Sequence, residues 1–322
     1  MMQWILVDKN FPPDQRRLLA SCETFRKRAL IGGPLGDVRE TIAHGIASVY
    51  VSPEYRGRGY ASRMLRELDR ALPTWQTRES GSDCIASVLY SDIGGEFYAR
   101  LGWRPAPCHH ISLEPARRES TTCVRPLNEE DLEVMCKLDG ELVWTALASP
   151  SQNGKSRFAI LPDWDHMRWH HRKEEFVCER LFGKTPNVKG AVAGELGSRI
   201  WVVWTHRYYE HPDNASGNTL YILRLGVEDQ RDGMTQSGVD VQVENLRLVL
   251  EAARAEAFEW DLQTIQLWDP SPTVTEWIER TGIPHRAEKR TEEGIGCLRW
   301  YGKGEGKQHE IDWLYNEKYA WC

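Results

Sequence analysis

A run of apolar residues that leads into two closely spaced glycines constrains the fold of this chain more than any other feature. Residues 46–51 (IASVYV) are mostly apolar and predict a strand. The turn Arg-Gly-Arg-Gly-Tyr-Ala follows at residues 56–61. The apolar period then becomes that of a helix, which ends before Pro73. The apolar face of this helix comprises Ala61, Met64, Leu65, Leu68 and Leu72.

The glycine turn is suited to bind a diphosphate without a metal ion. Backbone amides in such a turn point to one spot, and the start of a helix adds about half a positive charge there. Gly57 and Gly59 leave room for close approach, and Arg56 and Arg58 can add charge-assisted hydrogen bonds. A turn of this kind can also be nothing more than a tight turn, so its interpretation depends on the surrounding chain.

The first 113 residues alternate between strand and helix patterns. A short helix at residues 94–101 is stopped by Gly102, and a turn-forming run lies at residues 32–37. The predicted strands are residues 4–8, 22–30, 45–51, 84–90 and 109–113.

Two separate motifs give this region a resemblance to the GNAT superfamily of acyl-CoA N-acyltransferases. Arg56, Gly59 and Ala61 match the signature Gln/Arg-x-x-Gly-x-Gly/Ala of that superfamily. Residues 87–92 (SVLYSD), followed by residues 97–103 (FYARLGW), resemble its second shared element, a strand and then a helix ending in Tyr-x-x-x-Gly-aromatic. Because both motifs occur in the expected order, a simple tight turn is a much weaker explanation.

The resemblance implies acetyl-CoA as cosubstrate, no metal, and two parallel strands that separate so that the pantetheine arm lies between them. Its amides would pair with the backbone of the first of these strands. Tyr98 stands where the superfamily often keeps a tyrosine that protonates the leaving thiolate; the alternative is that it only packs under its helix. The residues implied to bind the cofactor are Val49, Tyr50, Val51, Arg56, Gly57, Arg58, Gly59, Tyr60, Ala61, Ser62 and Ser91.

The acceptor amine must be neutral to attack a thioester. A lysine-like amine has a pKa of about 10.4, so a base or a water chain has to take its proton. His44, just before the central strand, is the first candidate for the catalytic base, and a surface or capping role is its alternative. Glu40 and Asp92 are weaker candidates. Cys84 is not expected to carry an acyl group, because no histidine is paired with it in the sequence.

Longer stretches resemble one branch, the fungal lysine N6-acetyltransferase family; they are residues 22–28, 55–64, 87–94 and 313–322. This resemblance implies direct transfer of acetyl from acetyl-CoA to the side-chain amine of free L-lysine, in lysine catabolism. The alternatives are a CoA-binding pseudoenzyme or regulatory module, and an acetyltransferase for another small amine, a secondary metabolite or a protein lysine.

One departure from the superfamily concerns the start of the chain. A GNAT domain begins with a strand and two helices, whereas Met1 stands almost directly before the expected second strand. We therefore expect an N-terminally incomplete GNAT domain. Loss of an edge strand would leave exposed backbone that is prone to pairing.

The second half of the chain repeats the plan of the first. A polar stretch at residues 114–120 predicts a linker between an acetyl-CoA-binding domain over residues 1–118 and a second domain over residues 119–322. The order strand, long helix, strand, short helix ending in glycine recurs and predicts a degenerate GNAT-like domain. The expected fold is α/β (α+β), an N-terminal mixed sheet with flanking helices plus this second domain. Its predicted helices are residues 164–181, 243–260 and 272–280.

The second domain is expected to shape the acceptor cleft rather than to bind a cofactor. Its turn at residues 226–233 (GVEDQRDG) carries three acidic residues that would repel a pyrophosphate. Residues 313–322 are too aromatic for a free tail and are expected to dock, back over the cleft. The candidates for binding the two charged ends of an amino acid are Arg172, Arg224, Glu141 and Glu175.

Charge and composition narrow the class of protein further. A net charge of -6 disfavours nucleic-acid binding, and no apolar run approaches the roughly 18 residues of a membrane span, so a cytoplasmic protein is expected. The eight scattered cysteines argue against a zinc or disulfide framework. His166, His170 and His171 predict a polar helix face rather than a metal site. The oligomeric state stays open.

Overall fold

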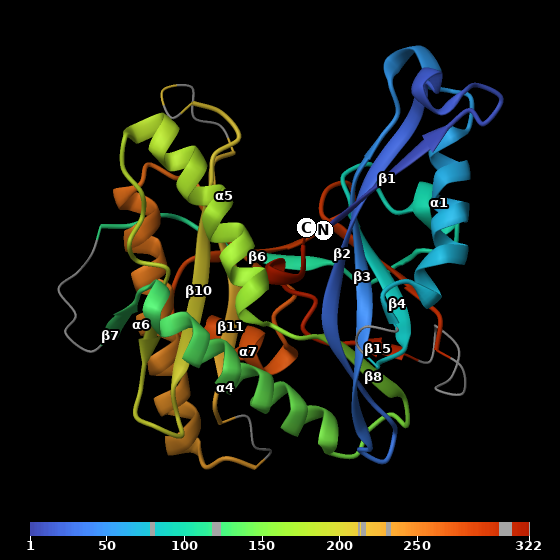
Figure 1. Cartoon of the computed structure of the whole chain (residues 1–322). Helices are drawn as coiled ribbons and strands as arrows, with labels where there is room; N and C mark the ends of the chain where they lie inside the picture. Colours follow the sequence, from blue (N-terminus) through green and yellow to red (C-terminus); the bar gives the residue numbers. More distant parts are fainter. Residues whose placement is uncertain are drawn as a thin grey trace.

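The computed structural model describes residues 1–77, 81–117, 124–211, 213, 217–229, 233–302 and 311–321. Within these ranges the chain forms an eight-stranded and a seven-stranded sheet that stand side by side (Figure 1). None of the helices in the described ranges combines the length and the apolar character that a membrane span requires. The mixed α/β class predicted from the sequence is confirmed.

The first sheet gathers strands from both ends of the chain. Its order is β15-β8-β2-β3-β4-β14-β5, and β1 pairs with β2. Helix α1 (Tyr60–Ala71) packs through Met64, Leu65 and Leu68 on the face that points away from the second sheet (Figure 1). The strands are β1 (Met2–Val7), β2 (Leu18–Gly32), β3 (Val38–Tyr50), β4 (Cys84–Ser91), β5 (Arg104–Pro105), β8 (Ser156–Ile160), β14 (Ile295–Trp300) and β15 (Ile311–Trp313).

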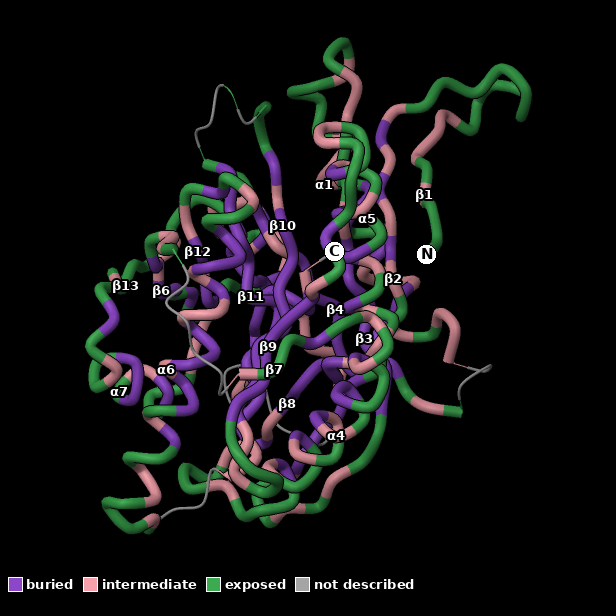
Figure 2. The backbone as a smooth tube through the Cα atoms, turned by 90° about the vertical axis from the view of Figure 1, so that its left-hand side faces the viewer, coloured by how far each residue is buried: buried purple, intermediate pink, exposed green. Residues whose placement is uncertain are grey.

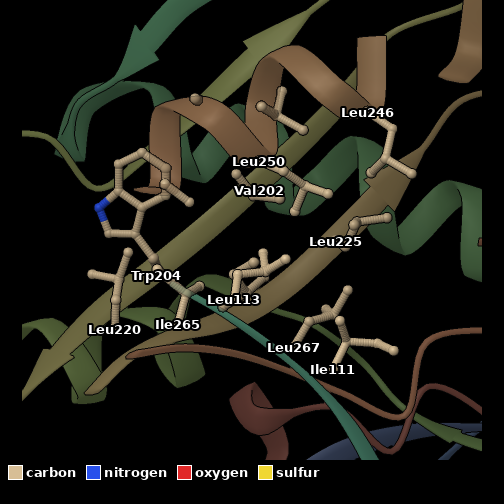
Figure 3. Packing of buried hydrophobic residues seen from close by; sticks show 14 of the residues in the cluster. Ile111, Leu113, Val202, Trp204, Leu220, Leu225, Leu246, Leu250, Ile265 and Leu267 are labelled. Carbon is tan, nitrogen blue, oxygen red and sulfur yellow. The ribbon is translucent and has the colours of Figure 1, made fainter. Parts of the chain in front are cut away.

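The second sheet has the order β13-β6-β12-β11-β10-β9-β7. Its strands are β6 (His109–Leu113), β7 (Val124–Leu127), β9 (Gly190–Ala193), β10 (Ile200–Arg207), β11 (Thr219–Val227), β12 (Thr264–Trp268) and β13 (His285–Lys289). The longer helices are α4 (Glu129–Ala148), α5 (Trp164–Phe182), α6 (Gln236–Glu259) and α7 (Pro272–Arg280). Figure 3 shows Leu250 and Leu246 of α6 on the side of Val202 and Leu225 of the sheet, where burial of apolar area stabilises this half.

The first sheet takes β8, β14 and β15 from the second half of the chain, and the second sheet takes β6 from the first half. Strand β6 was expected to close the first unit, but it pairs with β12 and β13 in the second sheet. In return, β14 pairs with β4 and β5 in the first sheet. Strands β6 and β14 each lie between two strands of the other half, so neither sheet is complete without the other half of the chain. The predicted boundary at residue 118 lies outside the described residues and stays a prediction.

The outer edge of β2 is covered, contrary to the exposed edge expected from the sequence. Strand β1 pairs with β2 from Leu18 to Thr24, and β8 pairs with it from Ala29 to Gly32. Helix α4 packs beside the same strand through Val143 and Leu147. Pairing on both stretches removes the unpaired backbone that would favour aggregation.

Candidate functional site

The parallel strands β3 and β4 separate at one defined point. They are paired up to Ile46 and Leu89. Beyond that point β3 continues to Tyr50 on its β2 side only, and β4 continues to Ser91 on its β14 side only. The two facing backbone edges are therefore available to an extended chain with amide groups. The structure shows the strand separation that the resemblance implies.

The glycine turn lies at the end of β3 and opens α1. Gly57 has φ +75° and Gly59 has φ +77°, both in the left-handed region that favours glycine. Gly59 is the residue preceding α1, and no side chain caps the amides of the first turn. A Cβ atom added at either glycine would meet nothing within 4 Å, so a ligand can approach the backbone closely. Figure 2 shows the exposed loops around α1.

The other long helices of the described chain begin differently. Asp163 caps α5, Thr235 caps α6 and Ser271 caps α7, each accepting a hydrogen bond from a first-turn amide. At α4 the Asp131 carboxylate accepts the N–H of Asn128 (2.9 Å). The start of α1 is thus the position where first-turn amides and the helix dipole are presented to a ligand.

The two arginines of the turn are exposed and lie along its rim. Arg56 donates from Nε to the carbonyl oxygen of Val51 (3.1 Å). Arg58 lies over the ring of Tyr55, with 5.8 Å between guanidinium carbon and ring centroid. Both keep nitrogen donors for a phosphate, so their predicted contact with one stays a prediction.

Tyr98 shares a buried cluster with the last paired residues of β3 and β4. It belongs to α3 (Glu96–Ala99) and to the same buried cluster as Ile46 and Leu89. Burial raises the pKa of Tyr98 to about 12, with smaller contributions from Cys297 and Asp92. The phenol is therefore protonated at neutral pH and can donate its proton to a leaving thiolate.

His44 is fully buried in the paired part of β3, opposite Ser87 of β4. Its Nε2–H donates to the carbonyl oxygen of Trp75 (3.2 Å). Burial and then Arg26 lower its pKa, so the ring is neutral, although the hydrogen bond to Trp75 opposes this shift. This contact fixes the turn after α1; the role of catalytic base stays a prediction.

The remaining first-half candidates have structural partners. Ser91 donates from Oγ to the carbonyl oxygen of Gly94 (2.6 Å), which shapes the turn after β4. Asp92 accepts the N–H of Gly294 (3.1 Å). Glu40 forms an exposed ion pair with Arg28 (2.8 Å), away from the strand separation.

The second half contains a matching separation, but the chain itself fills it. Strands β11 and β12 are paired up to Ile222 and Leu267. Beyond them, Glu317 of the C-terminal segment accepts the N–H of Leu225 (2.9 Å) and forms a buried ion pair with Arg224. The predicted docking of this segment is confirmed for residues 313–321; residue 322 lies outside the described residues.

Acidic repulsion, which the sequence suggested for the second half, is not what the described residues show. Glu228 binds Arg199 and accepts the N–H of Gly197 (2.7 Å), so its charge is compensated inside the fold. Residues 230–232 of the predicted turn lie outside the described residues. Glu317 instead occupies the edge of β11 at Leu225, where the arm of a second coenzyme would have to pair.

The four acceptor-binding candidates do not converge. Arg224 is saturated, because Asp139 (2.7 Å) and Glu317 both bind it. Arg172 is exposed and pairs with Glu129 (2.9 Å) and with Glu175. Glu141 is exposed on α4.

Cavities in three parts of the fold compete as the place where an acceptor enters. The largest of these three, about 1340 Å³, is lined by Val227, Leu267 and Trp313. A cavity of about 480 Å³ is lined by Arg28, Glu40 and Glu141. A small pocket of about 30 Å³, which the sequence did not predict, contains Lys173, Arg207 and Lys318. None of residues 44–64 lines any of the three.

Comparisons with known proteins agree with this geometry. Residues 110–322 match the family model described as the LYC1 GNAT-like C-terminal domain, and residues 22–105 match that of the acetyltransferase (GNAT) domain. A lysine acetyltransferase of Yarrowia lipolytica is 23% identical over 253 residues, covering 66% of this chain and 62% of that protein. An uncharacterized protein of Saccharomyces cerevisiae is 22% identical, covering 99% of this chain and 80% of that protein.

Several solved structures resemble this chain at low sequence identity. A GCN5-related N-acetyltransferase from Kribbella flavida has a TM-score of 0.46 and 19% identity, covering 88% of this chain and 57% of that one. The N-myristoyltransferase of Saccharomyces cerevisiae with bound myristoyl-CoA has a TM-score of 0.47 and 8% identity, covering 90% of this chain and 66% of that one. The chain thus spans less than two thirds of the Yarrowia relative and of both these structures.

Proposed function

We propose that this chain, which belongs to the LYC1 GNAT-like family of the GNAT acetyltransferases, transfers an acetyl group from acetyl-CoA. The proposed acceptor is the side-chain amine of free L-lysine, and the proposed location is the cytoplasm. The observation that carries the proposal is the uncapped start of α1 behind two left-handed glycines, placed where β3 leaves β4. This arrangement fits a diphosphate followed by an extended arm with amide groups.

Different residues of the first half have different roles in the transfer. The amides of the glycine turn hold the diphosphate, and the free edge of β3 pairs with the arm of the coenzyme. The reacting carbonyl then lies beside Tyr98, in the cluster of Ile46 and Leu89. The amine nitrogen forms its bond to the carbonyl carbon, the bond from carbon to sulfur breaks, and the phenol of Tyr98 protonates the sulfur.

Direct transfer is favoured over an acyl-cysteine route. Burial raises the pKa of Cys84 to about 12, and it also raises the pKa values of Cys22 and Cys297 to about 12. These thiols therefore stay protonated near pH 7, and a thiol is a much weaker nucleophile than a thiolate. Lysine as acceptor is supported by the likeness to the lysine acetyltransferase of Yarrowia lipolytica.

Release of free thiol from acetyl-CoA tests the proposal. We expect release with L-lysine to exceed release with other small amines or with a lysine-containing peptide. Calorimetric binding of CoA without release by any acceptor would contradict the transferase and favour a CoA-binding module. Failure to bind CoA at all would remove both functions.

A further inference from the structure

The pocket of Lys173, Arg207 and Lys318 brings cations together from three separate parts of the fold. Lys173 comes from α5, Arg207 ends β10, and Lys318 belongs to the C-terminal segment. One acidic residue, Glu174, lines the described part of the pocket. Its carboxylate is already bound by Lys189 (2.6 Å) and by the Nδ1 of His206 (2.7 Å). The pocket is therefore electropositive.

Lys318 is the most constrained of the three cations. It is only 6% exposed, and its ammonium lies over the rings of Tyr221 (4.4 Å), Trp268 (4.1 Å) and Trp321 (4.1 Å). Aromatic faces attract the charge but supply no strong acceptor for its three N–H donors. Burial lowers the pKa of Lys318 well below its usual value, and the nearby cations lower it further, although Asp92 opposes this shift from a distance. An anion beside the amine would restore its charged form.

Three other buried cations of the described chain are paired with carboxylates. Arg224 binds Asp139 at 2.7 Å, Lys189 binds Glu174 at 2.6 Å, and Arg290 binds Asp269 at 2.9 Å. No described carboxylate forms an ion pair with Lys318. A buried ammonium without such a partner is unfavourable unless an anion pairs with it. The pocket is therefore suited to bind an anionic group.

The neighbouring cations reinforce this polarity. Lys173 lies over Trp169 (5.4 Å) and Trp321 (5.3 Å). Arg207 lies over the ring of Tyr209 (4.9 Å), and no described carboxylate pairs with either cation. Burial, with a smaller contribution from Arg207, lowers the pKa of Lys173 to about 8. A carboxylate that enters the pocket would favour the charged form of the Lys173 amine.

Two aromatic contacts connect Lys318 with the strand separation. Trp268, which contacts Lys318, lies against Tyr90 with 6.1 Å between ring centroids. Tyr90 directly follows Leu89, the last residue of β4 that is paired with β3. An acceptor with its anionic end at Lys318 can therefore extend its amine past these rings toward the strand separation.

We propose that Lys318, supported by Lys173 and Arg207, binds the carboxylate of an amino-acid acceptor. This inference rests on the proposed acetyl transfer and specifies its substrate class: amines that also carry a free carboxylate several bonds away. It excludes simple diamines and lysines within a protein chain as preferred acceptors, because neither presents a carboxylate at that distance.

Two acceptors that differ only in the carboxylate test this subsite. We expect Lys318→Met to lower kcat/KM for L-lysine by about ten- to hundredfold, the range for losing a hydrogen bond between charged groups. The same variant should leave kcat/KM for 1,5-diaminopentane within about twofold, because that amine has no group for the pocket to bind. Lys318→Arg should recover part of the lysine activity. Equal losses for both amines, or wild-type indifference between them, would overturn the subsite.

A binding measurement separates the subsite from the proposed function. N6-acetyl-L-lysine is titrated into the CoA-loaded wild-type protein and into Lys318→Met, with the exposed Lys9→Met as control. We expect binding to the wild type and to the control but much weaker binding to Lys318→Met. Binding that depends on Lys318 without any turnover would contradict the transferase and keep the subsite. Binding unaffected by Lys318→Met would remove the subsite even in an active enzyme.

A milder variant guards against misfolding. Lys173→Met changes a half-buried side chain at the rim of the same pocket. We expect it to lower kcat/KM for L-lysine by about threefold to tenfold without changing that for 1,5-diaminopentane, since its contribution is more exposed to solvent. A loss confined to the diamine would contradict the assignment.

Discussion

The two strand separations of this molecule are similar in strand pairing, but the first is open to a ligand and the second is filled by the chain itself. In the first half, β3 and β4 part after Ile46 and Leu89, and no described side chain caps the helix that follows. In the second half, β11 and β12 part after Ile222 and Leu267, and Glu317 of the same chain binds the exposed edge. Thr235 caps the helix beyond it.

The difference shows how one backbone arrangement serves either binding or stability. Unpaired backbone inside a sheet is unfavourable until a partner supplies hydrogen bonds. The second half obtains that partner from its own C-terminal segment, through Glu317 and Arg224. The first half leaves the position to a ligand, and it keeps left-handed glycines where a ligand would approach.

The largest expected effect comes from placing a carboxylate in the open turn. Gly59→Glu should abolish CoA binding, a loss of about a thousandfold or more, because a side chain and a negative charge meet the diphosphate. Its Cβ has open space, so folding should lose only about 1 kcal/mol from the left-handed backbone. Calorimetry with CoA and thermal unfolding measure the two effects.

Gly233 supplies a matched control for this substitution. It has φ +79° in the turn before α6, and its Cβ would also meet nothing within 4 Å. Gly233→Glu therefore imposes the same backbone strain in the second half. CoA affinity should stay at the wild-type value, and an equal loss in both variants would show that the two turns do not differ as described.

The next effect tests whether Glu317 is structural. Glu317→Ala leaves the N–H of Leu225 without its acceptor and removes one of two carboxylates from Arg224. We expect the free energy of unfolding to fall by about 3 kcal/mol, as for other broken buried ion pairs. Denaturant titration measures this change. An exposed pair offers the control: Glu40→Ala, next to Arg28, should cost less than about 1 kcal/mol.

Substitution of Tyr98 tests the chemical step, which we assign to the first half of the chain. Tyr98→Phe should lower kcat about hundredfold while CoA affinity stays nearly constant, because the hydroxyl acts on the leaving thiolate and not on the diphosphate. The side chain is 9% exposed, and phenylalanine preserves its packing. Tyr208→Phe, which removes a buried hydroxyl of the second half, is the control and should leave kcat unchanged. Equal turnover of wild type and Tyr98→Phe would reduce Tyr98 to a packing role.

Local patterns predicted the glycine turn and its helix, the family resemblance implied the first separation, and neither predicted the acceptor pocket. The glycine turn, α1 and strands such as β12 are encoded by adjacent residues, so periodicity and glycine spacing reveal them. The exchange of β6 and β14 depends on pairing between residues far apart in sequence, for example Leu113 with Ile265. No local pattern specifies such a partner.

The pocket was missed for the same physical reason. Lys173, Arg207 and Lys318 are separated by long stretches of chain, and each is ordinary in its own sequence context. Arg224, which the sequence offered as a carboxylate binder, is instead bound to Asp139 and Glu317. The aromatic content of the C-terminal segment was the usable signal, and it predicted docking without showing what Lys318 would face.

The smallest expected effect is on how the free energy of unfolding depends on pH, and it compares one buried histidine from each half. In the second half, burial lowers the pKa of His206, but the charges of Glu174 and Glu256 outweigh it and raise that pKa to about 8. Because the folded pKa exceeds the unfolded value, His206 stabilises fully below about pH 6.5, and this contribution, about 2 kcal/mol, disappears as pH rises through 8. His44 in the first half has a lowered pKa, so its contribution is present above about pH 6.5 and is lost as pH falls. Urea unfolding across this range should lose its alkaline slope in His206→Gln and its acidic slope in His44→Gln. Identical profiles for the two variants would contradict the opposite environments that we assign to these histidines.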